Sequence, residues 1–116
     1  ALFNQAMRME GTPATARFEY AMLLREKGGD RGQVRQYLEK AAALNPQLAE
    51  AQYLLGLMAA SEERHADAVG YFEKALDVLP RQSPFWQALA GSYESLGDRD
   101  KALVAARRGV DSAAGE

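Results

Sequence analysis

Residues 49–82 read AEAQYLLGLMAASEERHADAVGYFEKALDVLPRQ, and their pattern recurs along the chain at a fixed spacing. At this spacing Pro46 recurs as Pro80, and the tripeptide Gly-Asp-Arg at 29–31 recurs at 97–99, two periods later. Because several small, large and proline positions share one register, we interpret the chain as a single array of repeats. The repeats follow one another without an insertion and cover residues 15–48, 49–82 and 83–116.

Each repeat contains two stretches with apolar residues at helical spacing. In the first stretch of the second repeat, Leu54, Leu55 and Met58 follow the i, i+1, i+4 pattern of one helix face. The second stretches carry their own apolar lines, which are Val34, Leu38 and Ala41, then Ala68, Phe72, Ala75 and Leu76, then Ala102, Ala106 and Val110. We therefore expect an all-α fold, built as a solenoid of helix–turn–helix units.

Glycine and aspartate mark the turn inside two of the repeats. Gly29 and Gly97 can adopt the left-handed conformation that ends a helix, and the aspartate after each can cap the next helix. The second repeat has residues 61–64, Ser-Glu-Glu-Arg, at this place, so we expect its turn to be less tightly fixed.

Proline marks the boundaries between helices. Pro46 and Pro80 are expected to end the second helix of their repeats, because a proline disfavours helical geometry at the residue before it. Ser83 followed by Pro84 suits a helix cap and the first helical position.

The chain resembles the tetratricopeptide-repeat family, which has a 34-residue period. The matching residues are Phe18 in the first repeat, Leu55, Gly56, Ala68, Phe72, Ala75 and Pro80 in the second, and Trp86, Leu89, Ala90 and Tyr93 in the third. The third repeat departs from the family at Ala106 and Gly109, where a larger residue and alanine are usual. The resemblance implies a right-handed superhelix with a concave and a convex side.

Residues 3–7 (Phe-Asn-Gln-Ala-Met) resemble residues 72–76. We therefore interpret residues 1–10 as the second helix of a truncated preceding repeat, and residues 1–14 as this helix with its join. The chain has no initiator Met, and we expect it to be a piece of a longer protein. Its Arg-rich, Lys-poor composition is typical of a bacterium with a GC-rich genome.

Catalytic and metal-binding patterns are missing from the sequence. There is no Cys and a single histidine, His65, which sits in a polar stretch and is expected to be a solvated surface residue. No glycine-rich phosphate loop occurs, and Glu62 and Glu63, as neighbours, are interpreted as a polar connection. We expect no enzyme activity and no cofactor.

The charge balance also limits the partners. A net charge of -2 gives no general attraction to nucleic acid, and no apolar run approaches the roughly 20 residues of a membrane span. A chain without cysteine suits the cytoplasm and the periplasm equally. We therefore expect a soluble protein whose partner is another protein or a peptide.

The family resemblance implies a binding groove on the concave side, lined by the first helix of each repeat. The candidate groove residues are Glu19, Leu23, Glu26, Glu50, Tyr53, Leu57, Gln87 and Glu94. Such a groove is apolar in the middle and acidic at its flanks, so it would suit an apolar peptide or helix with Lys or Arg beside it. A second reading is that Leu23 and Leu57 only pack against the next first helix. The Lys and Asn clamp of some family members is absent.

Two other roles stay open. The segment could be a structural spacer or a self-association module, since Leu103, Ala106 and Val110 would face no following unit and could join copies end to end. Alternatively, an enzyme domain elsewhere in a parent chain could use this region to position its substrate.

Overall fold

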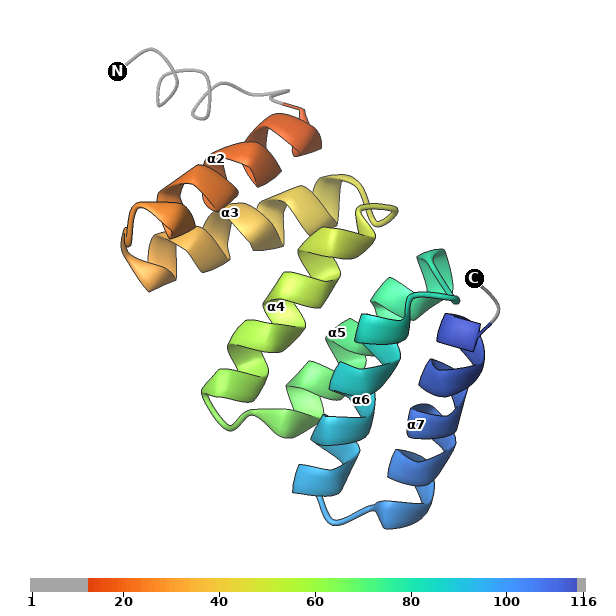
Figure 1. Cartoon of the computed structure of the whole chain (residues 1–116). Coiled ribbons are helices and arrows are strands. Elements are labelled where there is room, and N and C mark those ends of the chain that lie inside the picture. The colour runs from red at the N-terminus through yellow and green to blue at the C-terminus, as the bar shows by residue number, and fades with distance from the viewer. Residues whose placement is uncertain (1–12, 115–116) are drawn as a thin grey trace.

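The computed structural model describes residues 13–114, and this part of the chain folds into α-helices without a strand (Figure 1). The helices are α2 (Ala14–Glu26), α3 (Arg31–Leu44), α4 (Ala49–Ser61), α5 (His65–Val78), α6 (Ser83–Ser95) and α7 (Arg99–Ala114). The helices pack as α2 with α3, α4 with α5 and α6 with α7, and in Figure 1 the second helix of each pair runs back along the first. The predicted all-α architecture of stacked helix pairs is confirmed, whereas the helix predicted at residues 1–10 lies outside the described residues.

The pairs form an elongated stack. Its principal extents are 48 × 29 × 22 Å, and each second helix packs against the first helix of the next pair, α3 against α4 and α5 against α6. Since α3, α5 and α7 begin at Arg31, His65 and Arg99, the second helices recur at equal intervals that match the period of the sequence.

The turns inside the pairs reverse the chain through one left-handed residue each. Gly97 has this conformation as predicted, with φ 82°, but in the first pair it is Gly28, with φ 72°, and the prediction of Gly29 is wrong. The reason is that α2 ends at Glu26, one residue earlier than the repeat register implies, so its turn is one residue longer. In the middle pair Glu63 adopts φ 62°, which costs free energy for a residue with a Cβ.

Side chains close these turns as expected in two of the three cases. Asp30 accepts a hydrogen bond from the backbone N–H of Gln33 at 3.1 Å. Asp98 accepts one from the N–H of Lys101 at 3.2 Å. Both aspartates therefore satisfy donors that the first turn of a helix leaves free.

Proline ends the second helices where the sequence places it. Helix α3 stops at Leu44 and α5 at Val78, two residues before Pro46 and Pro80. The predicted cap at Ser83 is wrong by one position, because Gln82 caps α6 without a side-chain bond and Ser83 is already helical.

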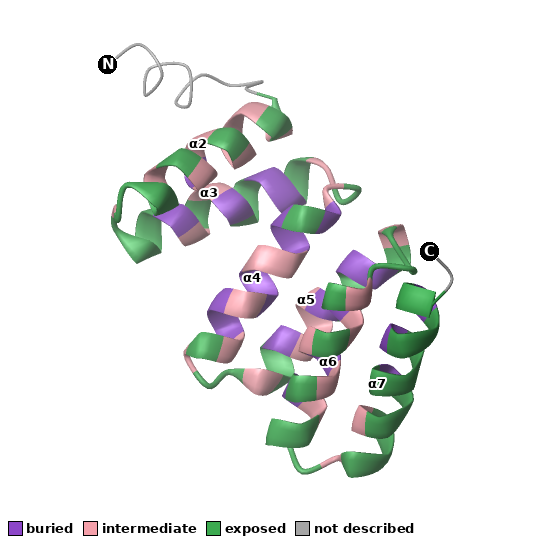
Figure 2. Ribbon diagram, viewed as in Figure 1, coloured by how far each residue is buried: buried purple, intermediate pink, exposed green. Residues whose placement is uncertain are grey.

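The core consists of two apolar clusters arranged along the stack (Figure 2). The first cluster joins α2, α3 and α4 through Ala21, Val34, Leu38, Ala42, Ala51, Leu55 and Met58. The second joins the remaining helices to α4 through Ala49, Ala59, Ala68, Phe72, Ala75, Leu76, Phe85, Leu89 and Ala105. Tyr71 is half-buried and packs against both clusters, so α4 and Tyr71 connect the two parts of the core.

The last helix departs from the predicted core line. Ala106 and Val110 are exposed, and α7 instead buries Ala105, Gly109 and Ser112. The residues one repeat earlier, Phe72 and Leu76 of α5, are on a helix that packs against α6. No helix of the described part packs against the outer side of α7. Its Leu103 is 69% exposed and Val110 67%, which agrees with the expectation that these residues face no following unit.

Helices α4 and α5 approach each other closely at Gly56. A Cβ atom placed on Gly56 would lie 2.4 Å from Cε1 of Phe72, which is far inside van der Waals contact. Phe72 is one of the two largest fully buried side chains, so its ring has little room to move. The contact between a residue without a side chain and a buried ring therefore sets the distance between the two helices.

We predict that Gly56→Ala destabilises the protein by about 1–3 kcal/mol, because the ring of Phe72 must move out of a close-packed site. The matched control is Gly70→Ala in α5, where a Cβ meets nothing within 4 Å and the better helix propensity should raise stability by up to about 1 kcal/mol. Urea unfolding followed by circular dichroism measures both. Equal stability of the two variants would contradict the packing argument.

Candidate functional site

The predicted groove residues form one stripe on each first helix. On α4 the stripe contains Glu50, Tyr53 and Leu57, whose spacing of three and four residues places them on one helix face. Helices α2 and α6 carry the remaining members at similar spacing, namely Glu19, Leu23 and Glu26, then Gln87 and Glu94.

The acidic members of this stripe are open to solvent. Glu19, Glu26, Glu50 and Glu94 are exposed, and none of them forms an ion pair within residues 13–114. Unpaired carboxylates on one side of a stack create a negative potential that attracts a cationic segment.

The apolar members are partly drawn into the core. Tyr53 is half-buried, with its ring centroid 4.5 Å from that of Phe85 and 5.8 Å from that of Phe72. Leu57 is also half-buried and packs against the second core cluster, whereas Leu23 is 54% exposed. The alternative that these leucines serve only in packing therefore applies to Leu57. Leu23, by contrast, presents an exposed apolar side chain.

The structure does not bring the acidic residues into one cavity. Glu50 lines a cavity of about 350 Å³ together with Phe18, Leu48 and Leu79. Glu94 lines a different cavity, of about 330 Å³, between α6 and α7. The exposed Gln87 has its Cγ 3.9 Å from the place a Cβ on Gly109 would take, so it sits beside α7. The predicted groove residues therefore lie at separate places on the first helices and not in a single pocket.

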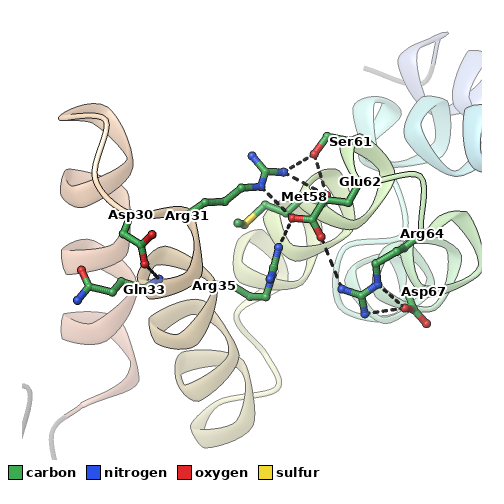
Figure 3. A network of polar contacts seen from close by, with 9 residues as sticks. All are labelled: Asp30, Arg31, Gln33, Arg35, Met58, Ser61, Glu62, Arg64 and Asp67. Carbon is green, nitrogen blue, oxygen red and sulfur yellow. Dashed lines mark hydrogen bonds and ion pairs between the residues drawn. The ribbon is translucent and has the colours of Figure 1, made fainter.

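Sequence reasoning missed a polar network that joins the first two helix pairs (Figure 3). Arg31, at the start of α3, donates from Nε to Glu62 at 2.9 Å and from its Nη2 to the carbonyl oxygen of Met58 at 3.2 Å and to the Ser61 hydroxyl. Arg35, one turn further along α3, also pairs with Glu62. The turn predicted to be loosely held is therefore tied to the preceding pair by charge.

Glu62 is the centre of this network. A third cation, Arg64, lies 3.6 Å from the Glu62 carboxylate and also pairs with Asp67 at 2.7 Å. The hydrogen bond from Arg31, followed by the charges of Arg35, Arg31 and Arg64, lowers the pKa of Glu62 from its ordinary value of 4.5, against an opposing effect of burial.

The second junction of the stack lacks these charges. The positions one repeat after Arg31, Arg35 and Glu62 are His65, Val69 and Leu96. The first junction is therefore partly ionic, while the corresponding place in the second is mainly apolar.

We predict that Glu62→Gln lowers stability at neutral pH and that the loss shrinks in acid. Since the folded pKa lies below the unfolded one, the carboxylate stabilises the fold fully above pH 4.5 and loses this contribution as the pH falls through the lowered pKa. Urea midpoints at several pH values measure the difference from the unmodified chain. The control is Glu63→Gln next to it, whose carboxylate forms no ion pair within residues 13–114. A Glu62→Gln effect that is independent of pH and salt would contradict the ionic junction.

The described residues offer no metal-binding group. Residues 13–114 contain no cluster of three or more His, Cys, Asp or Glu residues that could hold a metal ion. His65 is half-buried, and its Nδ1 is buried without a hydrogen-bond partner among these residues, so the expectation of a solvated histidine is wrong in part. None of the helices between residues 13 and 114 has the length and apolar content to cross a membrane.

Comparisons with known proteins agree with this architecture. Residues 49–80 match a family model described as tetratricopeptide repeat. The chain is 28% identical over 99 residues to the cytochrome c-type biogenesis protein CycH of Pseudomonas aeruginosa, a match that covers 84% of this chain and 24% of CycH. The chain thus spans about a quarter of that relative's length.

Solved structures of similar fold include MamA and YrrB. A crystal structure of MamA superposes with a TM-score of 0.82 at 26% identity and covers 90% of this chain and 60% of MamA. YrrB, described as a TPR protein with an unusual peptide-binding site, has a TM-score of 0.78 at 21% identity and covers 95% of this chain and 56% of YrrB. The second likeness concerns the fold alone.

Proposed function

We propose that this chain is a protein-interaction scaffold of the tetratricopeptide-repeat type that binds a peptide or helix along the first-helix stripe. The observation that carries the proposal is the row of exposed, unpaired carboxylates on α2, α4 and α6, with the exposed Leu23 among them. The ligand is an apolar segment with Lys or Arg beside it, which complements the stripe in charge and polarity. The role is binding and positioning, without a chemical step.

One relative supports this class of role. The name of CycH connects that protein with cytochrome c-type biogenesis. An assembly process needs modules that hold other proteins, and a stack of helix pairs supplies an extended surface for this.

The proposal also includes the division of the chain. The helix bounds support repeats at 15–48, 49–82 and 83–116, with the first turn one residue longer than the others. The array acts as one unit, because α4 shares its buried residues between both core clusters.

We predict that the double variant Glu19→Lys/Glu50→Lys weakens binding of a cationic amphipathic peptide, with a leucine face flanked by lysines, by about tenfold or more. The charge reversals replace attraction by repulsion at two exposed positions, so they should not disturb the fold. Fluorescence anisotropy with the labelled peptide measures the affinity.

The matched control is Asp77→Lys/Asp111→Lys, which makes the same charge change on the second helices α5 and α7. Unchanged affinity in the first variant, or an equal loss in both, would overturn the stripe as the binding surface. The equal loss would indicate a general effect of net charge.

A second candidate function is self-association through α7. The supporting observation is its exposed apolar surface, with Leu103, Val104 and Val110 each more than half exposed. Beside it lies the cavity of about 330 Å³ whose lining residues are Ala90, Glu94, Arg99, Ala102, Leu103 and Ala106. Apolar side chains that protrude next to an apolar cavity suit end-to-end contact between copies.

We predict that the mass of the chain rises with concentration in light scattering, and that Leu103→Lys/Val110→Lys abolishes the rise. Leu44→Lys on α3 serves as the control, since Leu44 is also more than half exposed but lies on another helix. A chain that stays monomeric at high concentration would eliminate this candidate and leave the binding stripe unaffected.

A further inference from the structure

A cavity on the other side of α4 has the features of a second binding site. Its volume is about 350 Å³, and it lies between α3, α4 and α5. It is lined by Glu39, Ala42, Ala43, Pro46, Gln52, Leu55, Tyr71 and Lys74. None of these residues belongs to the first-helix stripe.

The helical geometry of α4 separates the two sites. Glu50, Tyr53 and Leu57 share one helix face, whereas Gln52 and Leu55 project from the opposite one, as the periodicity of an α-helix requires. A ligand in the cavity therefore lies against the second helices and leaves the stripe accessible.

Gln52 is an unusual residue for the wall of an apolar cavity. Its side chain is only 6% exposed, and its Oε1 is buried without a hydrogen-bond partner among the described residues. A buried acceptor without a partner costs free energy, and proteins seldom keep one without a use. Because the last torsion of a glutamine is broad, the amide oxygen can turn toward a donor that enters the cavity.

The charges at the cavity balance each other. Glu39 comes from α3 and Lys74 from α5, and they form no ion pair with each other or with another residue of the described part. The Lys74 ammonium lies 5.9 Å from the ring centroid of Tyr71 instead. One charge of each sign gives no net attraction for an anion or a cation, which favours an uncharged occupant.

We propose that this cavity binds the side chain of a tryptophan or tyrosine presented by a peptide segment of a protein partner. Ala42, Pro46 and Leu55 provide apolar contact for the ring, and the volume suits an aromatic group. The N–H or O–H of the ring donates a hydrogen bond to Oε1 of Gln52. Gln52, whose Oε1 has no hydrogen-bond partner in the free protein, thereby favours an aromatic ring that carries a hydrogen-bond donor over one that does not.

The test uses blocked amino acids as probes in an NMR titration of the isotope-labelled chain. N-acetyl-tryptophanamide should shift the backbone amide signals of Gln52, Leu55 and Tyr71, with a dissociation constant of about 1 mM. The 1-methylindole analogue has nearly the same shape but no N–H donor, so it should bind about three- to tenfold more weakly. N-acetyl-tyrosinamide should bind better than N-acetyl-phenylalaninamide for the same reason.

Two variants test the assigned residues. Gln52→Met keeps the volume but removes the acceptor, so the preference for the N–H form should disappear while the thermal midpoint stays equal or rises. Ala43→Arg places a long side chain at an exposed position of the cavity wall and should weaken both probes without unfolding the chain. Gln36→Met, an exposed position on α3 outside the cavity, is the control.

Three results would overturn the proposal. Equal affinity for the indole and its methylated analogue would show that Gln52 accepts no bond from the ligand. A preference that survives Gln52→Met would place the acceptor elsewhere. Shifts confined to the α2 and α4 stripe would move the aromatic site to the groove, which contradicts this inference but not the proposed scaffold function.

Discussion

The close approach of α4 to α5 at Gly56 is the constraint on which the rest of the stack depends. Without a side chain at this position, the ring of Phe72 lies directly against the backbone of α4 and is fully buried. From there the ring also meets Tyr53, which in turn lies against Phe85 of the next pair. The contact between Gly56 and Phe72 thus sets the distance between α4 and α5, and through Tyr53 it also sets the position at which Phe85 of α6 packs.

Much of this arrangement could be predicted from the sequence, because residues at equivalent positions of a repeat occupy equivalent places in the fold. Val34 and Leu38 recur as Ala68 and Phe72 one period later, and all four are buried. Two of the errors occur where a single residue decides a helix boundary, at Gly28 and at Gln82. Local turns depend on where the preceding helix ends, and a shift of one residue changes which glycine takes the left-handed conformation.

The contacts between the pairs were beyond the reach of sequence reasoning. Arg31 and Glu62 are 31 residues apart, and neither belongs to the family pattern. They meet because α3 packs against α4 in one particular register. The same holds for the cavity beside Gln52, since a polar residue in the middle of an apolar helix reveals nothing by itself about a missing partner. Such features depend on how helix faces combine in space.

The first junction of the stack is partly ionic and the second mainly apolar, so their stabilities depend differently on temperature. Ion pairs such as those around Glu62 lose less to desolvation as the solution warms, whereas contact between apolar groups weakens on cooling. The joint between the first two pairs is therefore expected to be relatively stronger in heat, whereas within residues 13–114 no ion pair joins the second helix pair to the third. Chilling loosens the stack mainly through its apolar contacts, and concentrated salt loosens it mainly at the ionic joint. The two joints of one stack are therefore expected to respond differently to temperature and to salt.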